Sequence, residues 1–321
     1  MSTSWVAGTV RAKALARRRV GGAGARAIAT NDDLSAAVSA LAGTSYRHSV
    51  RGEQALAEAQ QAVAVTFLWH LRVLAGWLPR DGAQAIRLFA GGFEIANVDE
   101  HLRRLAGLSA EPSFDLGTLE TAWTRVAATS SMDDLRRVLA TSAWGDPGAA
   151  TPRDIHLGMR LAWAERVVGG VPAAAVWARA ALALLVVRES LLTARPLAGR
   201  QAERARNVLG PSFVGLQGGP VPALEDIAAH LPSDTRWALR HVEREQDLWT
   251  ADARWWHRVE DDGFALLRGA SFGPSPVVGA VAVLAADAWR VRAALETAAR
   301  GNSAASSPSR HDLMETFDAL A

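Results

Sequence analysis

The sequence predicts an all-α fold, and three observations support this prediction. Almost every segment with a periodic pattern of apolar residues has the spacing of a helix, about 3.6 residues. No segment shows the strict alternation of apolar and polar residues that is typical of a half-buried strand. The composition, with 49% hydrophobic and 21% charged residues over 321 positions, is typical of a globular chain that buries a large core.

The first three expected helices each combine an apolar stripe with a recognisable end. They span residues 32–43, about 52–76 and 89–105, and glycine ends or follows each of them. The third helix keeps a polar residue, Asn97, beside its apolar stripe. A buried amide without hydrogen bonds costs roughly 1–3 kcal/mol. We therefore expect Asn97 to specify how two helices pack, and not to belong to a reaction centre.

Further helices are expected after Gly107, separated by segments rich in glycine and proline. The strongest break lies between Gly210 and Pro220, and residues 273–276 are expected to form a turn before the last long helix. The expected helices span residues 115–128, 132–140, 152–168, 172–194, 233–268 and 277–300, and a small amphipathic helix is expected at 311–320.

The helices fall into groups of roughly 100 residues, which predicts a threefold internal repeat. A short sequence similarity supports the repeat, because residues 41–46 (LAGTSY) resemble residues 139–144 (LATSAW). Each segment ends a short helix with a small hydroxyl residue and then an aromatic residue. The expected units are 1–110, 111–209 and 210–300, followed at 301–321 by a flexible linker and a short amphipathic tail.

The charge balance and the absence of cysteine exclude several functional classes. The formal net charge is only +2, which implies no strong field for nucleic acid, and Lys13 is the single lysine. Without cysteine, no disulfide or cysteine-based metal site is possible. We expect no signal peptide, and the most apolar runs, 171–187 and 276–289, fall short of the roughly 20 apolar residues of a membrane span.

No segment carries a convincing catalytic, cofactor-binding or metal-binding motif. The chain has no phosphate-binding Gly-Lys-Ser/Thr loop, and the glycine-rich residues 20–25 are expected to form a flexible turn. Residues 99–101 (Asp-Glu-His) and 260–262 (Glu-Asp-Asp) are expected to be solvated helix faces, and Arg17-Arg18-Arg19 a charged helix end. We therefore expect no catalytic residue, cofactor or metal, and no nucleic-acid partner.

Three parts of the chain resemble the central-stalk subunit of V-type and A-type rotary ATPases, called C in prokaryotes and d in eukaryotes. The first is an arginine-containing segment at 10–15 with a later Thr-x-Tyr at 44–46. The second runs from Phe93 to Arg103. The third is a Phe-Gly-x-x-Pro turn at 272–276 before a helix that carries Asp287 and Arg292. Where the family usually has a glutamate near Ala285 and an asparagine near Arg290, neither is present. The positions that the resemblance marks as structural or interface residues are Arg11, Thr44, Tyr46, Phe93, Glu94, Asn97, Arg103, Gly273, Pro276, Asp287 and Arg292.

The resemblance implies three helical bundles in a pseudo-threefold, funnel-like body that is not catalytic. Such a subunit lies on the cytoplasmic face of the membrane, between the proteolipid rotor ring and the central shaft, and couples ATP-linked transport of protons or sodium ions. It has no transmembrane segment and no cofactor. Asn97 and Arg103 either hold the fold's own helices together, which we favour, or contact the shaft.

Two other functions remain open. One is a free-standing helical scaffold derived from the same family, which the departures in the last helix favour. The other is an all-α enzyme that uses Asp99, Glu100 or His101, which would require a deep pocket lined by these side chains.

Overall fold

The computed structural model describes residues 3–193, 199–211, 224–240 and 247–300, together with residues 195, 197, 213 and 242. These residues form helices and connecting segments without any strand, which confirms the all-α prediction. Contacts divide the chain into two compact units. Unit 1 comprises the described residues of Met1–Gly82 and Trp256–Ala321, and unit 2 comprises those of Ala83–Trp255. These bounds differ from 1–110, 111–209 and 210–300, and the three-unit division stays a prediction.

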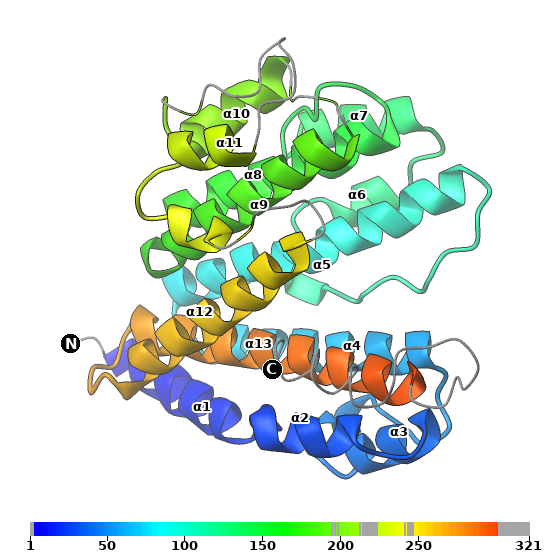
Figure 1. Cartoon of the computed structure of the whole chain (residues 1–321), viewed down its shortest axis with the longest axis vertical. Coiled ribbons are helices and arrows are strands. Elements are labelled where there is room, and N and C mark those ends of the chain that lie inside the picture. Colours follow the sequence, from blue (N-terminus) through cyan, green and yellow to red (C-terminus); the bar gives the residue numbers. More distant parts are fainter. Residues whose placement is uncertain are drawn as a thin grey trace. The chain divides into compact units, whose positions relative to one another are not determined.

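Unit 1 is organised around the long helix α13 (Pro274–Arg300), which packs against four shorter segments of the N-terminal part of the chain (Figure 1). These are α1 (Val6–Arg17), α2 (Gly21–Ala29), α3 (Leu34–Ala42) and α4 (Leu56–Gly76). Most of α13 is buried, and its surface is largely alanine and valine. Small side chains on all sides allow a helix to be surrounded by others, which explains the weak amphipathic pattern of this segment.

A close contact of two glycines joins α13 to the second half of α12 (Leu248–Arg268) within unit 1. A Cβ atom added at Gly279 would lie 2.5 Å from the carbonyl oxygen of Gly263. A Cβ atom added at Gly263 would lie 3.0 Å from the Cβ atom of Ala282. The two backbones therefore approach each other where neither residue has a side chain.

Unit 2 contains two clusters of buried apolar side chains that share the helix α8. One cluster gathers around Trp144 and the other around α9. Helix α8 packs against α9 and α10, and Trp163 on α8 donates a hydrogen bond of 2.6 Å to the carbonyl oxygen of Leu88. The helices of unit 2 are α5 (Arg80–Leu105, from Ala83), α6 (Trp123–Ala127), α7 (Met132–Ala140), α8 (Pro152–Gly170), α9 (Ala175–Thr193), α10 (Gly199–Leu209), α11 (Leu224–His230) and the start of α12.

Three expectations about local structure are wrong. Residues 20–25 are not a flexible turn, because the helix α2 begins at Gly21. Residues 115–128 are mostly not helical: they contain a 3-10 turn, η3 (Gly117–Leu119), and the short α6. Residues 233–268 are not one helix, since they contain the 3-10 turn η5 (Arg236–Leu239) before α12 begins.

The remaining differences concern helix ends. The helix expected from Phe89 begins earlier, at Arg80, and residues 274–276 of the expected turn form the first turn of α13. Proline is tolerated in a first helical turn because the N–H that it lacks would have no partner there. The helix α10 was not expected. The expected linker and tail at 301–321 lie outside the described residues.

Across the part of the chain that the structure describes, none of the helices is both long enough and apolar enough to span a bilayer.

Candidate functional site

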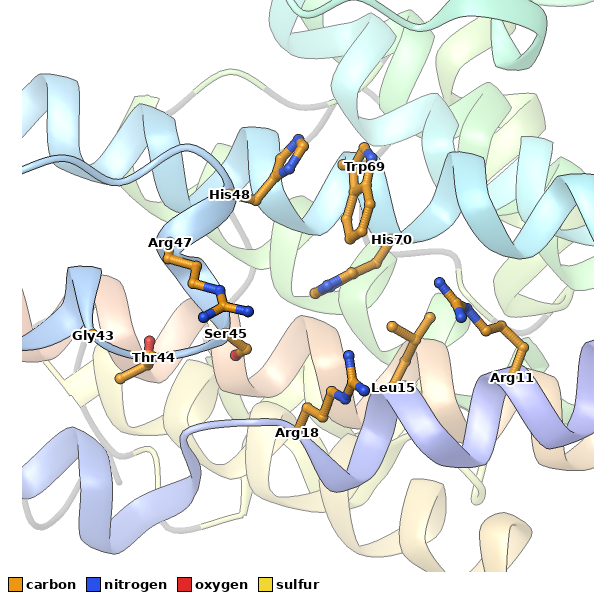
Figure 2. A pocket seen from close by; sticks show the side chains of 10 residues that line it. All are labelled: Arg11, Leu15, Arg18, Gly43, Thr44, Ser45, Arg47, His48, Trp69 and His70. Carbon is orange, nitrogen blue, oxygen red and sulfur yellow. The ribbon is translucent and has the colours of Figure 1, made fainter.

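A basic cavity in unit 1 is the best candidate for a functional site. It lies between α1, α4 and the 3-10 turn η2 (Ser45–His48), and its volume is about 760 Å³. Figure 2 shows arginine and histidine side chains from all three elements around the hollow. The lining residues are Arg11, Leu15, Arg18, Gly43, Thr44, Ser45, Arg47, His48, Trp69 and His70.

Helix geometry explains how α1 contributes to the cavity. Arg11, Leu15 and Arg18 are spaced by four and three residues, so all three lie on one face of the helix. Leu15 is 4% exposed, whereas Arg11 is half-buried and Arg18 is exposed. The face therefore places an apolar residue at the floor of the cavity, between two guanidinium groups.

A capped turn positions the opposite wall. The hydroxyl of Thr44 donates to the carbonyl oxygen of Leu41 at 2.7 Å and accepts from the backbone N–H of Tyr46 at 3.2 Å. This turn directs Arg47 and His48 toward the cavity (Figure 2). The ring of His48 stacks on Trp69 of α4, with 4.3 Å between the ring centroids.

The electrostatics of the cavity are dominated by positive charge. His70 is 8% exposed, and its pKa is lowered to about 4 by burial, followed by the positive charges of His48, Arg11 and Arg18. His70 is therefore neutral at pH 7. Among the residues that the structure describes, no carboxylate lines the cavity, and none is a hydrogen-bond partner of the buried Arg11 Nε.

A second hollow of about 580 Å³ adjoins the first and shares Arg18, Thr44 and Ser45 with it. It extends along α2 toward Asn31. The run Arg17-Arg18-Arg19 forms the charged C-terminal end of α1, as expected, since Arg17 lies in the last turn, Arg18 is the C-cap and Arg19 donates to the carbonyl oxygen of Ala16 at 3.2 Å. Arg18 lines both hollows, and Arg19, whose guanidinium lies 4.6 Å from the centroid of the Phe264 ring, lines the second.

Among the residues marked by the resemblance, Arg11 and Thr44 line the cavity, whereas Tyr46, Glu94 and Asp287 form two buried carboxylate contacts outside it. In unit 1, Asp287 of α13 accepts hydrogen bonds from the N–H groups of Val20 (3.1 Å) and Gly21 (2.7 Å). It also accepts from the hydroxyl of Tyr46 at 3.0 Å. Burial raises the pKa of Asp287, and burial together with the Asp287 charge raises the pKa of Tyr46.

Unit 2 contains the matching contact. The carboxylate of Glu94, on α5, accepts from the N–H groups of Thr121 (2.6 Å) and Ala122 (2.7 Å). It also accepts from the indole Nε1–H of Trp144 at 2.7 Å. In each unit one carboxylate of a long helix thus binds two consecutive backbone N–H groups and one aromatic side chain.

The turns that carry the two aromatic residues also match. Ser142 donates to the carbonyl oxygen of Leu139 at 2.7 Å and accepts from the N–H of Trp144 at 3.1 Å, as Thr44 does in unit 1. Both turns follow a nine-residue helix whose N-cap side chain, from Asp33 or Ser131, accepts a backbone N–H. The similarity of 41–46 to 139–144 therefore corresponds to a shared local structure.

The other marked residues of α5 make contacts within unit 2. Asn97 pairs with both backbone groups of Phe114: its Oδ1 accepts at 2.7 Å and its Nδ2 donates at 2.9 Å. Phe93 packs edge-on against the ring of Phe114. Arg103 donates to the carbonyl oxygen of Ser109 at 2.9 Å. Asn97 and Arg103 therefore bond to the non-helical segment that follows α5 and not to a second helix, so the expected helix–helix contact is wrong, whereas a role within the fold is supported.

The marked residues of the last helix are more dispersed. Gly273 precedes α13, Pro276 is buried in its first turns, and Arg292 is exposed. Arg290 lies three positions after Asp287, as Asn97 lies three positions after Glu94. Asp287 thus makes the contact that Glu94 makes in unit 2, whereas Arg290 pairs with Glu260, its Nη1 lying 3.1 Å from Glu260 Oε1.

The expectation of a solvated helix face is wrong for Asp99, His101 and Glu260, whereas Asp261 is exposed as expected. Asp99 accepts hydrogen bonds from Arg160 (2.9 Å) and pairs with His156 (3.1 Å), and His101 is 6% exposed. Glu260 is not part of a solvated acidic run, since it is the partner of the buried Arg290. The lining of the basic cavity includes neither Asp99 nor Glu100 nor His101.

Sequence reasoning missed Arg18, Arg47, His48, Trp69 and His70 as site residues. The helical spacing of Arg11 and Arg18 was a usable signal for one wall. Nothing in the sequence indicates that α1 and α4 enclose a hollow, because that depends on long-range packing.

Comparison of the chain with models of known protein families, and with curated proteins, gave no match.

Proposed function

We propose that this chain is a non-catalytic central-stalk adaptor that couples a proteolipid rotor ring to a central shaft, as in V-type and A-type rotary ATPases. The observation that carries the proposal is the recurrence of one contact, Asp287 with Tyr46 and Glu94 with Trp144. Asp287, Tyr46 and Glu94 belong to the parts of the chain that resemble that family. Their carboxylates are occupied by the chain's own donors, which favours a structural over a catalytic role.

An adaptor that transmits torque must resist deformation, and two features favour stiffness. Each buried carboxylate ties a non-helical or helix-starting segment to a long helix through three hydrogen bonds. Charge-assisted hydrogen bonds of this kind are stronger than those between neutral groups. The glycine contact between Gly263 and Gly279 brings two helix backbones together without a flexible side chain between them.

Purification of the tagged chain from its native membranes tests the proposal. We expect a proteolipid and a coiled-coil shaft protein to copurify with it in fixed ratio, and an unrelated tagged helical protein to retain neither. Deleting the gene should abolish ATP-driven ion transport but leave the nucleotide sites of the other subunits intact, and the reintroduced chain should restore transport.

The alternative is a free-standing helical scaffold derived from the same family. The observation that favours it is the replacement of the family's asparagine by Arg290, whose charge is neutralised inside unit 1 by Glu260. Purification of the chain alone, with no rotary ATPase genes beside its own, would support this alternative and contradict the adaptor.

A further inference from the structure

The basic cavity of unit 1 gathers positive charge that its own lining does not neutralise. Three guanidinium groups, from Arg11, Arg18 and Arg47, and two imidazoles line the hollow, and no acidic side chain from the described part of the chain does (Figure 2). Like charges that share a site repel one another, and this repulsion contributes to the lowered pKa of His70. This repulsion destabilises the free protein, and an anion bound in the cavity would relieve it.

Arg11 adds a second, independent observation. Its Nε atom is buried, and no hydrogen-bond acceptor lies within reach among the described residues. Leaving a buried charged donor unpaired costs more than the roughly 1–3 kcal/mol of a neutral group. A ligand oxygen in the cavity would supply the missing acceptor.

The shape of the cavity fits a small ligand better than a flat docking surface. His70 and Leu15 are buried at the floor, whereas Arg18, Arg47 and His48 are exposed at the mouth. Its volume of about 760 Å³ lies within the roughly 300–1,000 Å³ of small-molecule sites. The hydroxyl-bearing turn at Thr44 and Ser45 forms part of the wall.

We propose that this cavity binds an anion that carries phosphate groups. The planar fork of arginine matches the spacing of phosphate oxygens, and clustered arginines recur wherever phosphate is recognised. One carboxylate would neutralise a single guanidinium, whereas a molecule with two or three phosphates matches three of them. The source is a free phosphorylated metabolite or the headgroup of a lipid. This inference does not depend on the adaptor function.

Calorimetric titration of the full chain with inorganic pyrophosphate and with inositol trisphosphate tests the proposal. The double variant Arg18→Gln/Arg47→Gln removes two exposed charges at the mouth. We expect it to weaken binding by at least about tenfold, because it removes two charge-assisted hydrogen bonds to phosphate oxygens. The control Arg17→Gln/Arg125→Gln removes two exposed arginines outside the cavity and should leave the affinity unchanged.

Vesicle flotation distinguishes the two sources. Flotation with vesicles that contain a phosphoinositide but not with phosphatidylcholine alone, reversed by inositol trisphosphate, assigns the site to a lipid headgroup. Binding of the soluble probes without flotation assigns it to a free metabolite. A glutamate-rich peptide that binds as tightly as the phosphate probes and loses affinity in the same double variant would overturn the proposal in favour of an acidic protein segment.

A nuclear magnetic resonance titration of His70 gives a readout that does not depend on variants. A bound phosphate should offset the positive charges around the ring and raise the pKa of His70 from about 4. No heat with either probe and an unchanged His70 titration would show that the cavity does not bind phosphate.

Discussion

The phenolic hydroxyl of Tyr46 donates a hydrogen bond of 3.0 Å to the carboxylate of Asp287, which lies 241 residues later in the chain. Tyr46 follows the capped turn at Thr44, and Asp287 lies in the middle of α13. The same carboxylate binds the N–H groups of Val20 and Gly21. One buried acid therefore fixes the start of α2 and the turn after α3 on the central helix of unit 1.

Tyr46 is the single tyrosine of the chain, so its ionisation can be followed by ultraviolet absorbance alone. Because burial and the Asp287 charge both raise the pKa of Tyr46, we expect it to ionise well above pH 10 in the folded protein. Asp287→Asn should lower this pKa, since it removes the neighbouring negative charge. An ionisation midpoint near pH 10 in the folded wild type would contradict the buried contact.

Glu94→Gln should destabilise unit 2 by about 1–3 kcal/mol. The carboxylate accepts from three donors, whereas the amide keeps one oxygen and turns an NH₂ group toward a donor, at Thr121 or Ala122. Urea unfolding followed by circular dichroism measures the change. Glu111→Gln, at an exposed position, is the matched control and should change the free energy of unfolding by less than about 0.5 kcal/mol. Equal stability of the two variants would contradict the role given to Glu94.

Asn97→Leu should also lower the stability of unit 2, because it leaves the N–H and the C=O of Phe114 without their partner. The expected cost is on the order of 2 kcal/mol. Asn97→Asp keeps an acceptor for the Phe114 N–H but loses the donor, so it should fall between the wild type and Asn97→Leu. The thermal midpoint gives the order, and an unchanged midpoint together with lost assembly would assign Asn97 to a partner interface.

The helices with clear caps and stripes were predictable from the sequence. The segment at 132–140 was predicted with the bounds that α7 has, because its N-cap residue, Ser131, and its stripe are local signals. The helix α2 was missed because three of its first four residues are glycine. Its first N–H groups are bound by Asp287, which is 266 residues away and leaves no local trace.

The same limit explains the loop at 115–122 and the basic cavity. The apolar spacing of 115–128 is compatible with a helix, but Glu94 binds the N–H groups of Thr121 and Ala122 before α6 begins. The sequence places Arg11 and Arg18 on one face of α1, yet it does not show that His70 of α4 lies opposite them. The local sequence pattern predicts the helices. Long-range contacts between polar groups determine the conformation of the loops and the position of the site.

Gly279→Ala should destabilise unit 1 by roughly 1–3 kcal/mol, because the new methyl group would lie 2.5 Å from the backbone oxygen of Gly263. The conflict involves two helix backbones, which cannot move as a flexible side chain would. Gly76→Ala, in α4 of the same unit, has no heavy atom within 4 Å of its Cβ position. This control should be neutral or gain up to about 1 kcal/mol from helix propensity. Denaturant unfolding of both variants distinguishes close packing from the general effect of replacing glycine.

The lowered pKa of His70 predicts a specific loss of stability in acid. In the unfolded chain histidine takes up a proton as the pH falls through about 6.5, whereas the buried ring of His70 does so only near pH 4. Between these values the unfolded state binds the extra proton, so stability falls as the pH decreases through this window. The difference between these two pKa values corresponds to about 3 kcal/mol in the free energy of unfolding.

His70→Gln removes the titrating group. Between pH 6.5 and pH 4, the free energy of unfolding of this variant should therefore fall by about 3 kcal/mol less than that of the wild type. Urea unfolding at several pH values measures this difference in the free energy of unfolding. Inositol trisphosphate bound in the cavity should reduce the difference between wild type and His70→Gln, because it raises the pKa of His70 toward its unfolded value. Parallel pH profiles of His70→Gln and the wild type without ligand would mean that the ring is not held neutral by burial and by the charges of His48, Arg11 and Arg18.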